Sequence, residues 1–113
     1  MWEQDDLQSR WLALENKLTQ RFGKKPDMET LLFLIGIQEL GQIAKFSKEQ
    51  KQELMHVAVC RLLSASGYYK HEKTDEDGWP HYQPVKPVPK YTGVEQENFL
   101  KDHILLYFQE NEF

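Results

Sequence analysis

The sequence predicts a mainly helical fold, a small four-helix bundle with a β-hairpin inserted before the last helix. Four segments repeat apolar residues at spacings of three and four, which is the period of a helix with one buried face. Between the third and the fourth segment, aromatic residues flank a polar turn, which is typical of a β-hairpin. The chain of 113 residues is also long enough to bury a core without disulfide or metal support. We therefore expect one domain over residues 1–113.

The first helix is expected over residues 5–22. Gly23 follows it as a natural C-terminal stop. The apolar residues of this segment fall on one helical face. They are Leu7, Trp11, Leu14, Leu18 and Phe22. We expect this stripe to pack against the rest of the bundle.

A second helix is expected over residues 27–45, with Asp27 as its N-cap. Apolar residues cover most of its circumference between Leu31 and Ile43, so we expect this helix to be central. Glu39 lies inside the apolar stretch. Burying an unpaired carboxylate costs several kcal/mol, so Glu39 needs a partner.

Capping-box spacings mark the starts of the other two helices. In a capping box, a Ser or Thr side chain and the side chain three residues later each satisfy a backbone N–H group at the helix start. SKEQ, from Ser47, precedes a helix expected over residues 48–66. TGVE, from Thr92, precedes a helix expected over residues 93–110.

A β-hairpin is expected over residues 68–85 around the turn sequence TDEDG, followed by KPVPK as an extended, polyproline-like connector. The hairpin concentrates aromatic and histidine side chains. They are Tyr68, Tyr69, Trp79, His81 and Tyr82. One interpretation is that half of the aromatic residues pack onto the helices as a lid over the core. The other is that they bind a partner, because protein interfaces use aromatic residues as anchors.

Glu39 and His103 form the other candidate site. His103 is a polar residue on the apolar face of the last helix, which makes it the first candidate partner for Glu39. A hydrogen bond between them, or from a tyrosine or tryptophan to Glu39, would be structural. Alternatively, the pair lines a pocket or an oligomer interface and binds a ligand, because perturbed groups cluster at functional sites. General acid or base catalysis by the pair is a third possibility.

The sequence contains no phosphate-binding Gly-rich loop, no G-x-S-x-G, no CxxC and no HExxH motif. Glu53 and His56 match one copy of the Glu-x-x-His motif of di-iron bundles, which need two copies and two further glutamates. His56 and Cys60 supply only two ligands for a soft metal. We therefore expect a non-enzymatic protein with no catalytic residue, no metal and no cofactor.

Charge and composition limit the partners and the cellular location that we expect for this protein. A net charge of −4 and a pI near 5.5 disfavour nucleic acid as a partner, because the field repels phosphate. The N-terminal residues lack the features of a secretory signal, and no apolar run reaches the roughly 20 residues needed to cross a bilayer. One cysteine, Cys60, cannot form an internal disulfide. We expect a cytoplasmic protein that does not bind membranes.

The segments FLIGIQELG, KQELMHVAVCRLL and DGWPHYQP resemble a group of short uncharacterised bacterial proteins, over roughly Leu31 to Phe108. The resemblance implies a complete cytoplasmic bacterial protein and supplies no activity, ligand or partner. From the residues, we expect a protein-interaction module that forms homo-oligomers or binds another protein. The alternative is a helical bundle that binds a small molecule or metal, with Glu39 and His103 in its pocket.

Overall fold

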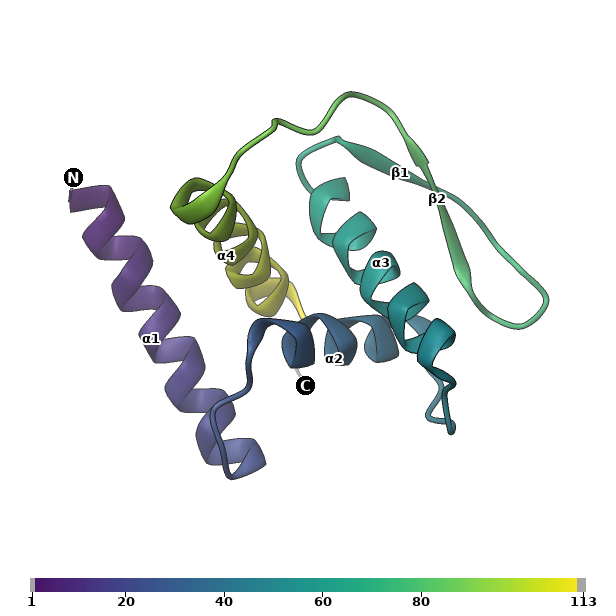
Figure 1. Ribbon diagram of the computed structural model, residues 1–113, viewed down its shortest axis with the longest axis horizontal. Coiled ribbons are helices and arrows are strands. Elements are labelled where there is room, and N and C mark those ends of the chain that lie inside the picture. The colour runs from purple at the N-terminus through teal and green to yellow at the C-terminus, as the bar shows by residue number, and fades with distance from the viewer. Residues whose placement is uncertain (1, 112–113) are drawn as a thin grey trace. The chain divides into compact units, whose positions relative to one another are not determined.

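The computed structural model describes residues 2–111, and their side chains from residue 6 onward (Figure 1). Within this range the chain forms four helices and one two-stranded antiparallel sheet, and 61% of the chain is helical. The elements in chain order are α1 (Trp2–Phe22), α2 (Met28–Leu40), α3 (Lys48–Ser64), β1 (Tyr69–Thr74), β2 (Pro80–Pro84) and α4 (Gly93–Glu110). This confirms a mainly helical fold with a hairpin before the last helix. None of the described helices is both long and apolar enough to cross a membrane.

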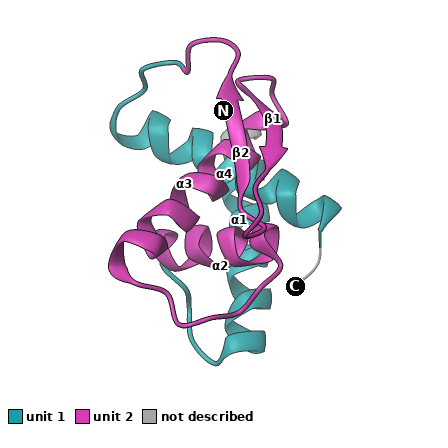
Figure 2. Cartoon of the chain, turned by 90° about the vertical axis from the view of Figure 1, so that its right-hand side faces the viewer, with its two compact units in different colours: residues 1–27, 89–113 teal, residues 28–88 magenta. Residues whose placement is uncertain are grey.

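The chain divides into two compact units (Figure 2). The first unit comprises residues 1–27 and 89–113, and the second comprises residues 28–88. Each unit is described separately below. The packing of all four helices as one bundle, and the single domain over residues 1–113, therefore stay predictions.

The first unit pairs α1 with α4. The expected stripe of α1 is buried from Leu7 to Leu18. A guanidinium nitrogen of Arg10 lies 3.5 Å from a carboxylate oxygen of Asp102, which joins the two helices at their surface. The prediction is wrong for Phe22, which is 46% exposed. Phe22 is the last residue of α1, so no further helical turn extends the stripe around it.

The second unit is built on the crossing of α2 and α3. Gly36 lies at the closest approach of the two backbones. A Cβ atom added to Gly36 would overlap the carbonyl oxygen of Leu54, so only glycine fits at this position. Leu54 and Ile35 are both 0% exposed. The core of this unit therefore depends on direct contact between helix backbones.

The second helix ends five residues before the predicted end at residue 45. It stops at Leu40, because Gly41 adopts a φ of 75°, a conformation that ends a helix and that glycine adopts without strain. Ile43, which was expected on the apolar face, lies in the following loop and is 92% exposed. Gly41 thus redirects the chain, and the loop reaches the hairpin turn.

The two predicted capping boxes have different outcomes. At α3, Ser47 and Gln50 exchange both side-chain hydrogen bonds, at 3.1 Å and 2.9 Å, which confirms the prediction. At α4, Thr92 occupies the N-cap position, but its side chain makes no capping hydrogen bond. The prediction of a capping box at Thr92 is therefore wrong, although α4 begins at the expected residue.

The hairpin joins β1 and β2 with an irregularity at Glu72, where the register shifts between His71 and Lys73. Both strands contact α3, beside which the hairpin runs in Figure 1. The turn between the strands, residues 75–79, lies at one end of the hairpin, and the chain leaves β2 at the other. This arrangement places the turn beside the N-terminal half of α3.

Candidate functional site

A groove of about 440 Å³ lies between α3 and the turn end of the hairpin, entirely within the second unit. We call it the α3–hairpin groove. Its lining residues are Gln50, Glu53, His56, Val57, Asp75, Asp77, Trp79, Pro80 and His81. A volume of this size falls in the range of pockets that hold small ligands or a few side chains of a bound peptide.

The α3 wall of the groove follows from helical periodicity. Gln50, Glu53 and Val57 recur at spacings of three and four, so they lie on one face of the helix. Glu53 and His56 are exposed, whereas Val57 is buried and forms the apolar floor of this wall. The capping box anchors the first turn of the helix, so Gln50 begins the wall from a fixed position.

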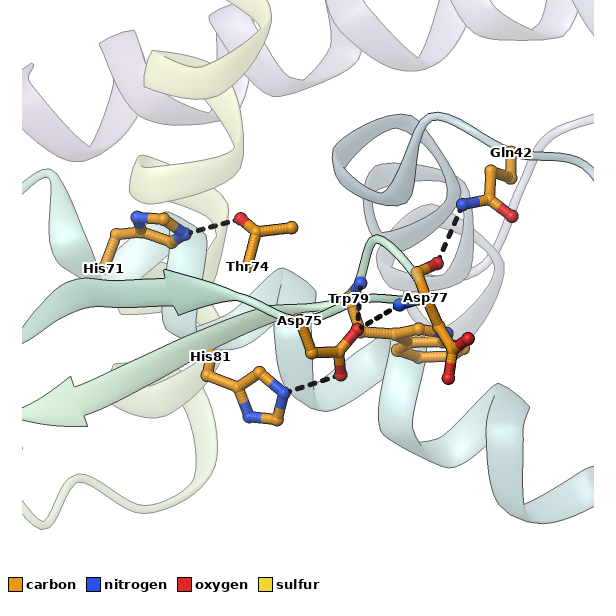
Figure 3. Close-up of polar contacts among 7 residues, drawn as sticks. All are labelled: Gln42, His71, Thr74, Asp75, Asp77, Trp79 and His81. Carbon is orange, nitrogen blue, oxygen red and sulfur yellow. Dashed lines mark hydrogen bonds and ion pairs between the residues drawn. The ribbon is translucent and has the colours of Figure 1, made fainter.

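Asp75 organises the hairpin wall (Figure 3). Its Oδ1 atom accepts hydrogen bonds from the backbone N–H groups of Asp77 and Trp79, each at 3.0 Å. The N–H of Asp75 donates to the carbonyl of Trp79 at 2.9 Å, and the N–H of Gly78 donates to the carbonyl of Asp75 at 3.0 Å. One side chain therefore fixes the backbone of the whole turn.

The second oxygen of Asp75 pairs with His81 across the hairpin. Nε2 of His81 lies 2.8 Å from Oδ2, and Figure 3 shows the two side chains pointing toward one another. The hydrogen bond from His81 is the main reason why the pKa of Asp75 lies below its usual value, and the N–H of Trp79 adds to it. Because the carboxylate accepts, Nε2 of His81 carries the hydrogen.

An aromatic chain ties the turn to α2. The ring of Trp79 meets the ring of Phe46 edge to face at 6.4 Å, and Phe46 meets Phe33 of α2 at 6.2 Å. The amide of Gln42 donates to the backbone carbonyl of Asp77 at 2.9 Å (Figure 3). These contacts hold the hairpin wall in place beside α3, so the groove is largely preformed.

The groove is acidic and has one aromatic wall. Glu53 and Asp77 are exposed carboxylates, and neither makes an ion pair with a Lys or Arg of the described residues. No Lys, Arg, Ser, Thr or Cys is among the described residues that line it. His81 therefore has no hydroxyl, thiol or amine nucleophile beside it among the described lining residues.

Residues 2–111 contain no group of three or more His, Cys, Asp and Glu side chains arranged to hold a metal ion. The sulfur of Cys60 lies 3.6 Å from Nε2 of His56, one turn away on α3. Burial raises the pKa of the Cys60 thiol, so the sulfur is protonated at neutral pH. This pair is a hydrogen bond within α3 between a buried cysteine and a histidine that lines the groove.

Glu39 lies in the second unit, where its Oε1 is 3.4 Å from Nε of Arg61 on α3, and both side chains are partly buried. His103 lies in the first unit, is 8% exposed, and donates from Nδ1 to the carbonyl of Phe99 at 2.7 Å. Glu39 thus has a charged partner that sequence analysis did not consider. Because the two residues belong to different units, their pairing, and a ligand between them, stay predictions.

The comparison with protein-family models gave no match, and neither did those with curated proteins and with solved structures. The candidate site therefore depends on the residues and geometry described above.

The five hairpin residues predicted as partner contacts lie in three different places. Trp79 and His81 line the groove. Tyr82 packs toward the helices, where burial and the charge of Glu39 raise its pKa. Tyr68 and Tyr69 are half-buried at the far end of the hairpin. The structure thus places some of the aromatic residues against the helices and leaves two at a surface groove.

The α3 wall and the turn carboxylates were missed by sequence reasoning. Glu53 was considered only as part of a metal motif, and TDEDG only as a polar turn. The missed signal is the joint occurrence of exposed carboxylates on one helical face and in the turn of the next hairpin. That signal becomes specific only when the hairpin is known to lie beside α3.

Proposed function

We propose that this protein is a non-enzymatic interaction module whose α3–hairpin groove binds a basic, extended segment of a protein. The observation that carries the proposal is the acidic groove itself, with exposed carboxylates on both walls and no Lys or Arg among its described lining residues. The wider setting of this proposal is a cytoplasmic bacterial protein whose four helices pack as one bundle. The resemblance supports a cytoplasmic bacterial protein, and the apolar faces of the helical segments support one bundle.

Electrostatics sets the charge of the ligand. Asp75 already accepts hydrogen bonds from His81 and from the turn N–H groups. The remaining carboxylates, Glu53 and Asp77, face the groove from opposite walls. Lys or Arg side chains placed between them would be attracted by both, and complementary charge increases the rate and specificity of association.

The aromatic wall favours an extended segment that contains proline. Trp79 and Pro80 supply a rigid apolar surface on the hairpin side, and Val57 supplies an apolar patch on α3. Aromatic-lined grooves bind proline-rich segments because the polyproline conformation is already extended and loses little entropy on binding. A lysine ammonium beside Trp79 also gains from cation–π attraction.

The test is an NMR titration of ¹⁵N-labelled protein with the synthetic peptide KPAPKPAPK. We expect saturable shift changes confined to the amides of residues 50–57 and 75–81 and to the indole N–H of Trp79, which a Trp79→Phe spectrum assigns. Raising the salt concentration from 0.05 M to 0.5 M should weaken the affinity several-fold, because salt screens exposed charges.

The matched control peptide is EPAPEPAPE, which keeps the prolines and reverses the charge. Equal binding of both peptides would contradict the proposal, and so would shift changes outside the groove alone. A double variant, Glu53→Lys with Asp77→Lys, should abolish the shifts. The variant with Glu72→Lys and Glu110→Lys changes the net charge by the same amount at exposed positions outside the groove and should bind like the wild type.

A further inference from the structure

We infer that the basic segment that fills the α3–hairpin groove comes from a second copy of this chain, and that it is the connector Lys86–Lys90. This inference rests on the proposed function. It adds the identity of the partner and the residues that the partner contributes to the site. The chain would then form a dimer in which each copy binds the connector of the other.

The connector has the chemistry that the groove requires. Its sequence, Lys-Pro-Val-Pro-Lys, places a cation at each end of an alternating proline segment. It forms neither helix nor strand, and Lys86, Pro87 and Lys90 are exposed. Two lysines separated by an extended segment match a groove with one free carboxylate on each wall, Glu53 and Asp77.

The connector cannot place both of its lysines in the groove of its own copy while the hairpin is intact. The groove is lined by Pro80 and His81 at the start of β2, and the connector leaves the far end of this strand. At roughly 3.3 Å per residue, the strand separates Pro80 from Val85 by about 17 Å. The ammonium of Lys86 lies 4.6 Å from the ring centroid of Tyr68, which holds the connector at the far end. A second copy supplies the same segment without this constraint.

Reciprocal binding gives a closed dimer with twofold symmetry. Each copy contributes one groove and one connector, so the same contact is made twice and no free copy of either surface remains. A contact of this size is small beside a permanent interface, so we expect a concentration-dependent dimer whose affinity falls with salt.

The experiment is sedimentation velocity on the full chain at 0.05 M salt over a hundredfold range of concentration. The wild type should shift from monomer to dimer. The groove variant, Glu53→Lys with Asp77→Lys, should remain a monomer at every concentration. The connector variant, Lys86→Glu with Lys90→Glu, should also remain a monomer. Far-UV circular dichroism confirms that each variant keeps its helix content.

Mixing the two variants gives the decisive result. In a mixed pair, an acidic groove meets a basic connector on one side, and a basic groove meets an acidic connector on the other. The equimolar mixture should therefore recover the dimer that each variant has lost. Failure of the mixture to dimerise, with both variants folded, would overturn the inference.

A charge control separates this mechanism from a general effect of net charge. Lys17 and Lys24 are exposed and lie outside the connector and the groove. The variant Lys17→Glu with Lys24→Glu should dimerise like the wild type, and its loss of dimer would overturn the inference.

Sedimentation and peptide binding together distinguish failure of this inference from failure of the proposed function. A wild-type protein that stays monomeric at every concentration, yet binds KPAPKPAPK in its groove, overturns the second copy as partner and leaves the groove as a binding site. A protein that dimerises unchanged in both charge-reversed variants overturns the inference, because its interface then lies elsewhere.

Discussion

The side of α3 that packs on α2 differs from the side that lines the groove, although the residues that define the two sides are adjacent in sequence. Leu54 is 0% exposed, and its backbone carbonyl packs against Gly36 of α2. Glu53, the preceding residue, is exposed and lines the groove beside the hairpin. One side is dry, apolar and sterically tight. The other is open, polar and acidic.

This contrast indicates that stability and binding can be changed separately in this protein. Burial of apolar surface supplies most folding free energy, whereas exposed charges contribute little to it. Exposed charges do determine which partner approaches and in which orientation.

The largest effect is expected for Leu54→Ala. It removes a fully buried side chain from the α2–α3 contact, and such changes lower the free energy of unfolding by about 2–5 kcal/mol. The matched change Glu53→Ala should alter it by no more than about 0.5 kcal/mol, because the side chain is exposed. Urea unfolding followed by circular dichroism measures both. Equal effects would refute the division of α3 into two sides.

A slightly smaller loss is expected for Gly36→Ala. The added Cβ would overlap the carbonyl oxygen of Leu54, which is backbone and cannot rotate away. Overpacking of this kind costs about 1–3 kcal/mol, although alanine favours a helix by about 1 kcal/mol over glycine. A net loss in thermal or urea unfolding is the expected result.

Gly23→Ala is the control for Gly36. Gly23 has a φ of 85° and no atom within 4 Å of an added Cβ, so only backbone strain opposes the change. The two variants therefore separate steric overlap from strain. A Gly36→Ala protein as stable as the wild type would contradict the close approach of α2 and α3.

The ion pair between Glu39 and Arg61 is expected to contribute less. The atoms are 3.4 Å apart and partly buried, and pairs of this kind typically contribute about 0.5–1 kcal/mol. A double-mutant cycle with Glu39→Gln and Arg61→Met isolates their coupling from the other contacts of each residue. A coupling energy of zero would show that Glu39 depends on a different partner, and His103 would be examined next.

The smallest effect on stability is expected at Asp75, where pH is the variable. Its pKa is lowered in the folded protein, so the stabilisation is complete above the usual aspartate pKa of about 3.9 and is lost as pH falls through the folded pKa. His81→Gln should raise the pKa of Asp75 part of the way back, because the backbone donors remain. NMR titration of the carboxyl carbon measures this pKa.

His71→Gln is the control for His81. His71 lies on the same hairpin and hydrogen-bonds to Thr74 at 3.1 Å. Its replacement should leave the pKa of Asp75 unchanged. An Asp75 pKa that is the same in wild type and His81→Gln would contradict the hydrogen bond across the turn.

Much of the fold followed from local patterns in the sequence. The α1 stripe from Leu7 to Leu18 and the Ser47 capping box each depend on residues within one helix, and both were predicted correctly. The end of α2 was predicted wrongly because the apolar residue Ile43 was given more weight than Gly41, whose backbone conformation ends the helix. The backbone conformation of Gly41, and not the apolar pattern, therefore determines where α2 ends.

The candidate site was only partly predictable, for a physical reason. Trp79 and His81 were selected from the sequence because aromatic residues on a hairpin are typical of interfaces. Their opposite wall, Glu53 and His56, is more than twenty residues away in sequence, and only the packing of the hairpin on α3 brings the walls together. Arg61 was missed as the partner of Glu39 for the same reason, because it belongs to the neighbouring helix.

The most direct test of the account is the affinity of the Glu53→Gln protein for KPAPKPAPK, measured beside its urea unfolding. Loss of one charge pair should weaken binding by about fivefold, which corresponds to about 1 kcal/mol. The free energy of unfolding should stay within about 0.5 kcal/mol of the wild-type value. An unchanged affinity would contradict the claim that the acidic side of α3 is the binding surface.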